Sequence, residues 1–135
     1  MKNILIIVFL TSIIFVFNSC KNESNESNNL KDIYYVKYDI TTSSIYSGYN
    51  LYVKINTETG IQNFVSKPAT FSEIFGPVSI GFLSNIETYT DAYSATVTAR
   101  IYICKNSGPF VLKSMDTKSN PNDTNPLKIN YKIDF

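Results

Sequence analysis

The sequence predicts an all-β domain, and specifically an immunoglobulin-like antiparallel sandwich of about seven or eight strands. Apolar and polar residues alternate with a period of two through most of residues 32–135, and no stretch keeps a helical period. Turn-forming residues separate these stretches at intervals of roughly 8 to 12 residues. The 10 Tyr and 9 Phe also suit a pleated sheet. A small closed barrel is the alternative, because alternation and strand number do not separate the two architectures.

The first half of the domain predicts four strands. Residues 34–40 and 49–56 alternate cleanly, and Gly60 closes a turn from which residues 61–65 return as a hairpin partner. Residues 69–75 form the next segment, which is expected to end at Gly76-Pro77. The apolar faces of the two clean strands are Tyr34, Val36, Tyr38 and Ile40, then Tyr49, Leu51, Val53 and Ile55.

The second half predicts four more. Residues 78–83 alternate briefly, residues 85–93 are polar and are expected to form a loop, and residues 95–104 form the longest strand. Residues 110–115 follow a turn at 106–109, and residues 116–126 contain no apolar residue. Residues 127–135 alternate again, with Leu127, Ile129, Tyr131, Ile133 and Phe135 on one face, so this strand is expected in the core.

The N-terminal residues predict export. Lys2 is followed by an apolar run from Ile4 to Phe17, which is shorter than the about 20 residues that a membrane span needs. Ser19 is a small residue at the expected cleavage site, so residues 1–19 are predicted to be a signal peptide. An uncleaved anchor or a buried helix is the alternative.

Cys20 makes this prediction more specific. The segment Phe17-Asn18-Ser19-Cys20 resembles a relaxed bacterial lipobox of the kind seen in Bacteroidetes lipoproteins, in which the cysteine carries the lipid. Residues 20–31 are then a lipidated cysteine and a polar tether, and residues 32–135 are one β-sandwich domain. The predicted location is the outer membrane, on its periplasmic face or at the cell surface. The alternative is a Cys20 that stays free or forms a disulfide with Cys104.

A wider resemblance covers most of residues 33–114. The segments VKYDI, VKINTETG, GPVSIGF and ATVTARIYICKNSGPFVLK resemble small Bacteroidetes lipoproteins with an MmpS-type transport accessory domain. That family implies an immunoglobulin-like sandwich without known catalytic residues, and it supplies no functional site. The residues that carry the resemblance are Val36, Tyr38, Ile40, Thr59, Gly60, Thr96, Val97, Thr98, Ile101 and Tyr102.

The composition excludes several classes of function. The chain has no histidine, which removes the commonest general base and metal ligand, and its 12 basic and 11 acidic residues give no basic footprint for nucleic acid. No phosphate-binding glycine loop or Cys-x-x-Cys pair occurs. We therefore expect a protein that is not an enzyme and has no cofactor.

Two weak site hypotheses remain. Tyrosines cluster in the first two strands, and Tyr35, Tyr46 and Tyr52 are candidates for binding a glycan or an envelope protein, although core and cross-strand packing is the favoured explanation of the cluster. Oxygen-bearing residues in the late polar stretch are weak calcium candidates, while an ordinary Asn/Asp loop is the alternative. These residues are Asp116, Asn120, Asn122 and Asp123.

The function expected from these features is a lipid-anchored, non-catalytic binding or accessory module for a protein, glycan or small ligand, acting as a monomer. The alternative is a structural or assembly subunit that pairs through an edge strand.

Overall fold

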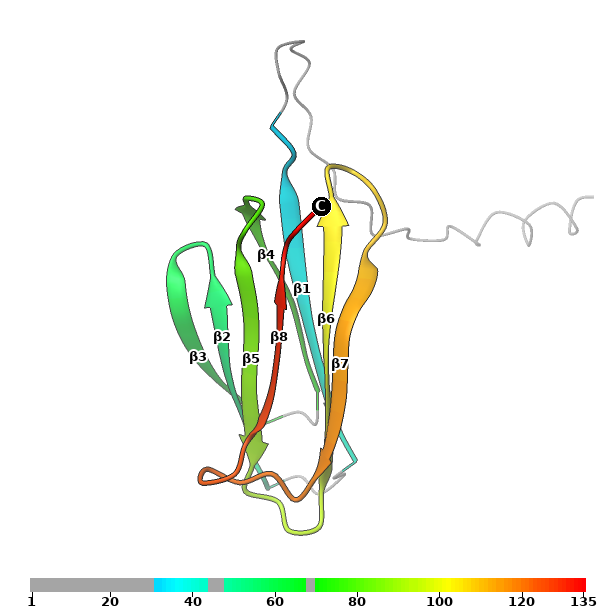
Figure 1. Cartoon of the computed structure of the whole chain (residues 1–135). Coiled ribbons are helices and arrows are strands. Elements are labelled where there is room, and N and C mark those ends of the chain that lie inside the picture. Colours follow the sequence, from blue (N-terminus) through cyan, green and yellow to red (C-terminus); the bar gives the residue numbers. More distant parts are fainter. Residues whose placement is uncertain (1–30, 44–47, 68–69) are drawn as a thin grey trace, which may run out of the picture.

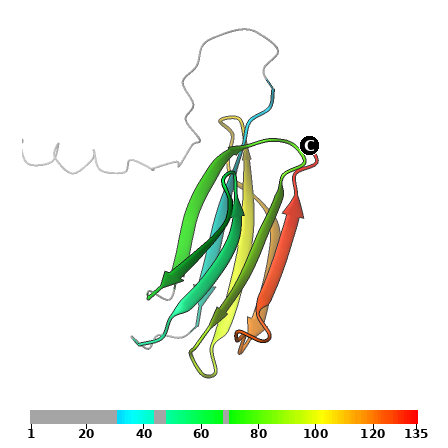
Figure 2. The same cartoon turned by 90° about the vertical axis from the view of Figure 1, so that its left-hand side faces the viewer.

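The computed structural model describes residues 31–43, 48–67 and 70–135, which contain eight strands in two antiparallel four-stranded sheets. The two sheets lie face to face as layers (Figures 1 and 2). The predicted sandwich is therefore confirmed, and the closed barrel is wrong because each sheet ends in edge strands. One sheet has the order β4-β1-β6-β7, formed by Thr70–Val78, Tyr34–Thr42, Thr96–Lys105 and Val111–Ser119; the other has the order β3-β2-β5-β8, formed by Gly60–Ser66, Leu51–Thr57, Leu83–Thr90 and Leu127–Lys132.

The likeness to an immunoglobulin domain lies in the architecture and not in the strand order. An immunoglobulin constant domain pairs its first strand with its second, whereas β1 pairs with β4 and β6. Consecutive strands share a sheet only in the β2–β3 and β6–β7 hairpins of the described chain. The other connections cross from one layer to the other, which ties the two sheets together.

The core lies between the sheets and is built by the predicted alternation. In β1 the four inward side chains are completely buried, while the residues between them are half-buried on the outer face. The same pattern holds in β2 and β6. The apolar side chains that these three strands direct into the core are Tyr34, Val36, Tyr38, Ile40, Leu51, Val53, Ile55, Val97, Ala99, Ile101 and Ile103.

Strand β5 corrects the loop expected at residues 85–93. It runs from Leu83 to Thr90, and its inward positions after Ile86 are filled by buried threonines. Thr88 and Thr90 donate hydrogen bonds through their hydroxyl groups to the carbonyl oxygens of Tyr52 and Asn50, at 2.8 and 2.9 Å. The hydroxyls are satisfied inside the sandwich, so a polar stretch behaves as a core strand.

The structure shows that two expectations around Gly76-Pro77 are wrong: the strand expected at residues 69–75 does not end there, and residues 78–83 do not form a separate strand. β4 continues through both residues to Val78, and a turn follows. A proline fits here because β4 is an edge strand. Gly76 lies in a bulge of β4 opposite β1 and has a φ of 135°. A Cβ atom at this position would lie 3.0 Å from the Tyr34 carbonyl oxygen, so the backbone conformation and the close approach both favour glycine.

The two last strands complete the edges of the sandwich. β7 extends to Ser119, so the first part of the polar stretch 116–126 belongs to a strand and not to a loop. β8 pairs with β5, and Leu127, Ile129 and Ile133 are buried, which confirms the terminal strand as part of the core. Tyr131 is only half-buried and Phe135 is 39% exposed, so three of the five predicted side chains are fully inside.

The described residues contain no helix with the length and hydropathy of a membrane span.

Candidate functional site

The structure separates the tyrosines that the sequence grouped together. Tyr35 lies on the outer face of the β4-β1-β6-β7 sheet, because its neighbours Tyr34 and Val36 point into the core. Tyr52 lies on the outer face of the other sheet, between the buried Leu51 and Val53. Tyr46 lies outside the described residues. The three candidates therefore do not form one site, and Tyr52 has to be considered with its own neighbours.

The partner of Tyr52 is Tyr89, which directly faces it across the β2–β5 pair. Their rings stack with centroids 4.6 Å apart and an interplanar angle of 10°. Tyr89 falls in the segment expected to be a loop, and for that reason the sequence did not identify it. The alternation of β-branched and aromatic residues in Ile86-Glu87-Thr88-Tyr89-Thr90 is the signal that predicts a strand and places Tyr89 outward.

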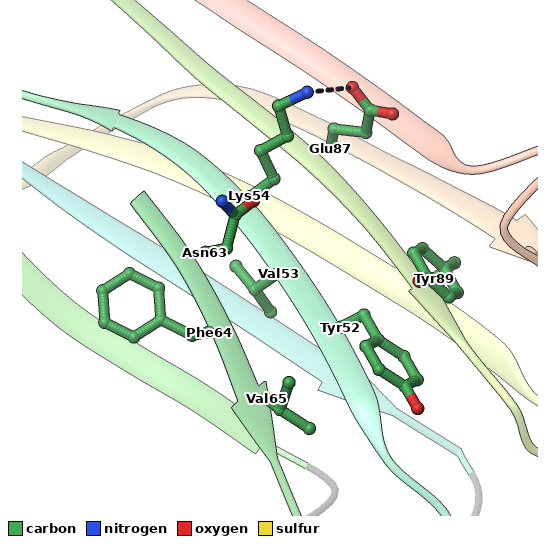
Figure 3. A pocket seen from close by; sticks show the side chains of 8 residues that line it. All are labelled: Tyr52, Val53, Lys54, Asn63, Phe64, Val65, Glu87 and Tyr89. Carbon is green, nitrogen blue, oxygen red and sulfur yellow. Dashed lines mark ion pairs between the residues drawn. The ribbon is translucent and has the colours of Figure 1, made fainter. Parts of the chain in front are cut away.

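A shallow groove of about 210 Å³ lies beside this pair on the outer face of β3, β2 and β5 (Figure 3). In Figure 3 the Tyr52 and Tyr89 rings lie on neighbouring strands at one end of the groove, and Val65 lies next to them on β3. The lining is mainly apolar at this end and polar at the other. The residues that line the groove are Tyr52, Val53, Lys54, Asn63, Phe64, Val65, Glu87 and Tyr89.

A row of charges crosses the same face next to the tyrosines. Glu87 forms two ion pairs, between its Oε2 and Lys54 Nζ at 3.8 Å and between its Oε1 and Lys128 Nζ at 3.4 Å. One carboxylate on β5 therefore lies between ammonium groups from β2 and β8. The side chains of both lysines are largely exposed, at 47% and 61%. Exposed pairs of this kind contribute little to stability. Their donors and acceptors are available to a ligand that lies over the face.

An Asn–Asp contact lies next to the stack on the side of the β5–β6 connection. Asn50 donates from its backbone N–H to Asp91 at 2.6 Å and from its side-chain amide to the same carboxylate at 2.9 Å. The Asn50 amide also lies 3.4 Å from the Tyr52 hydroxyl. Partial burial is the main cause that raises the pKa of Tyr89, and repulsion from Tyr52, Asp123 and Asp91 adds to it. The phenol is neutral at neutral pH with or without this shift, so it can both donate and accept hydrogen bonds.

Two of the four calcium candidates, Asp116 and Asn122, use side-chain oxygens in hydrogen bonds within the chain. Asn122 accepts through Oδ1 from the backbone N–H groups of Thr124 and Asn125, and Asp116 accepts from the N–H of Thr117. The Lys118 ammonium group donates to Asn125 and to the Pro126 carbonyl oxygen, so a cation of the chain already occupies part of this loop. Asn120 adopts a positive φ of 52° at the end of β7. No group of three or more His, Cys, Asp or Glu that could hold a metal occurs in residues 31–43, 48–67 and 70–135.

The alternation in β6 places Cys104 on the outer face, opposite to its buried neighbour Ile103. The structure nevertheless shows Cys104 fully buried. The turn after β6 folds over it, and its sulfur lies 3.2 Å from the Gly108 carbonyl oxygen. Cys20 lies outside the described residues, so its lipidation stays a prediction and a disulfide with Cys104 stays the alternative.

Comparison of the chain with protein-family models, with curated proteins and with solved structures found no match.

Proposed function

We propose that the chain is a non-catalytic binding module that takes a glycan on the outer face of the β3-β2-β5-β8 sheet. The observation that supports this most is the stacked Tyr52–Tyr89 pair, which stands beside the groove and is only half-buried. A tyrosine offers an apolar ring together with a hydroxyl that remains in water. The C–H faces of a sugar ring pack against such a ring, and its hydroxyls meet the polar rim.

The polar groups around the stack fit the same ligand class. Sugar hydroxyls both donate and accept hydrogen bonds, and the face offers ammonium donors at Lys54, a carboxylate acceptor at Glu87 and an amide at Asn63. The groove of about 210 Å³ is smaller than the roughly 300–1,000 Å³ of a site that encloses a small molecule. A short segment of a longer glycan, lying across the face, fits this shape better than an enclosed small ligand.

Affinity electrophoresis through gels that contain one soluble polysaccharide each, for example xylan, mannan, mixed-linkage β-glucan or starch, tests the proposal. At least one polysaccharide should retard the protein, and Tyr52→Ala or Tyr89→Ala should weaken that binding at least about tenfold, which corresponds to about 1.4 kcal/mol. Tyr35→Ala is the matched control, because Tyr35 lies on the outer face of the opposite sheet. An equal loss in Tyr35→Ala, or no retardation by any polysaccharide, would contradict the proposal.

A lipid anchor at Cys20 is the second part of the proposal. It is supported by the apolar run that ends in Ser19-Cys20 and by the polar residues 21–29, which would hold the domain within at most about 33 Å of a membrane. The proposed location is the outer membrane, on the periplasmic face or at the cell surface. Radiolabelled palmitate should enter the wild-type chain and not Cys20→Ser. Equal labelling of the two, or a Cys20–Cys104 disulfide in the purified protein, would contradict it.

A relation of this chain to small lipoproteins with an MmpS-type transport accessory domain is also a proposal. The resemblance to the MmpS-type transport accessory domain is supported by the two-sheet sandwich, and it assigns no ligand to the groove.

A further inference from the structure

Strand β3 forms an unusual edge of the sandwich. Edge strands expose unpaired backbone groups, and proteins protect them from pairing with charged side chains or proline. β4 contains Glu73 and Pro77, and both β7 and β8 contain lysines. The seven residues of β3, Gly-Ile-Gln-Asn-Phe-Val-Ser, include neither a charge nor a proline. Of the four edge strands in the described chain, β3 is therefore the one that lacks these protective residues.

The backbone of β3 presents its free groups at every second residue. The direction follows from the neighbouring strand β2, which lies between β3 and β5. The Asp91 N–H donates to the Asn50 carbonyl oxygen just before β2, so the even-numbered residues of β2 direct their backbone N–H and C=O groups toward β5 and the odd-numbered residues direct theirs toward β3. Residues 53 and 55 then bond to residues 64 and 62 of β3. The N–H and C=O groups of Ile61, Asn63 and Val65 consequently point away from the sheet, where no strand of the described residues pairs with them.

The side chains of the same three residues form a pattern that complements itself. Ile61 and Val65 lie on the outer face and are each 63% exposed, and Asn63 lies midway between them. When two copies of β3 run antiparallel about Asn63, Ile61 of one copy faces Val65 of the other, and Asn63 faces itself. Apolar cross-strand pairs of this kind are stabilising, and each outward residue would exchange two backbone hydrogen bonds with its opposite.

We propose that β3 pairs antiparallel with β3 of a second copy of this chain, about a two-fold axis at Asn63. The pairing joins the two β3-β2-β5-β8 sheets into one continuous sheet, and it replaces the monomer that the sequence predicts. A two-fold contact closes on itself, so it yields a dimer and not a fibre. The pairing is argued from the edge position and side-chain pattern of β3 and not from the glycan proposal, although Asn63 and Val65 also line the groove.

Cysteine cross-linking of the full chain tests the register. Two Asn63→Cys copies would face each other within the roughly 4.4–6.8 Å between Cα atoms that a disulfide spans. Mild oxidation should therefore double the mass of Asn63→Cys on a non-reducing gel. The matched control is Asn130→Cys, an exposed asparagine on β8 at the opposite edge of the same sheet, which should stay at the monomer mass. The unmodified chain, with Cys20 and Cys104, gives the background.

A mixed experiment makes the test specific for the two-fold pairing. Ile61→Cys and Val65→Cys should cross-link when they are mixed, and neither should cross-link alone. Two copies of residue 61 would be displaced by four residues, or about 13 Å along the strand, which is beyond the reach of a disulfide.

A charge at the axis supplies an independent readout. Asn63→Lys would place two ammonium groups opposite each other, so light scattering of the detergent-extracted full chain should give half the mass of the unmodified protein, while Asn130→Lys should leave the mass unchanged. A monomer mass for the unmodified chain, cross-linking of Asn63→Cys no stronger than that of Asn130→Cys, or its cross-linking to a different protein would each overturn the proposal. If Asn63→Lys does not fold, the cysteine variants still decide the test, because they place a small residue at an exposed position.

Discussion

Ile133 should be one of the residues on which the stability of the sandwich depends most. Its side chain is completely buried between the sheets, although it lies just beyond the end of β8. Its backbone is held by two hydrogen bonds, one from its N–H to the Phe82 carbonyl oxygen at 3.0 Å and one from the Gly81 N–H to its own carbonyl oxygen at 2.7 Å. The surroundings are therefore fixed and cannot collapse easily around a smaller side chain.

Replacing Ile133 by alanine should lower the free energy of unfolding by about 3 kcal/mol, within the about 2–5 kcal/mol measured for buried isoleucine or leucine truncations. In a domain of this size, each kcal/mol shifts Tm by about 4–8 °C, so the melting temperature should fall by about 12–24 °C. Urea unfolding and thermal melts followed by circular dichroism measure both quantities. Asn130→Ala is the control, because Asn130 is exposed on the outer face of the same strand, and it should change the free energy by less than about 0.5 kcal/mol.

Truncation extends the same reasoning to the whole strand. Ending the chain after Asn125 removes the three buried side chains Leu127, Ile129 and Ile133, at about 1.5–3 kcal/mol each, or about 4.5–9 kcal/mol together. That loss is comparable to the about 5–15 kcal/mol of total stability, so the truncated chain should be unfolded at room temperature. A cooperative melt of the truncated chain, or an Ile133→Ala melt within about 3 °C of the wild type, would refute the assignment of β8 to the core.

Three further predictions concern polar groups. Burial raises the pKa of Tyr38 above its ordinary 10.0, so its neutral phenol contributes fully to stability below about pH 10, and this contribution is lost as the pH rises further. The loss amounts to at most about 1.4 kcal/mol per pH unit, and Tyr38→Phe should reduce it in urea titrations at alkaline pH. An unchanged pH dependence in the variant would contradict the prediction. Thr88→Val should cost about 0.5–1.5 kcal/mol, because it removes the hydroxyl that donates to the Tyr52 carbonyl oxygen, and a stabilised variant would show that this bond has no net value. Glu87→Gln should change the free energy of unfolding by less than about 1 kcal/mol, because both of its lysine partners are largely exposed; a larger loss in a urea titration would mean that the charge row stabilises the fold.

The sequence alone determined the fold class and most of the core. Side chains of a strand alternate between two faces, so the apolar residues of β1, β2, β6 and β8 identify their inward positions without any knowledge of their neighbours. Hydropathy failed at β5, where Thr88 and Thr90 occupy inward positions. Their burial depends on the carbonyl oxygens of Tyr52 in β2 and of Asn50 just before it, which are far away in sequence and come close only when β2 and β5 pair.

Only the tertiary structure decided the strand order and therefore the candidate site. Alternation specifies which side chains share a face of one strand, but it does not specify which strand lies beside it. The pairing of β2 with β5 brings Tyr89 against Tyr52, and the separation of β1 into the other sheet removes Tyr35 from that group. The same long-range pairing leaves β3, which the sequence predicts only as a hairpin partner, at an edge of its sheet, where Ile61 and Val65 are exposed.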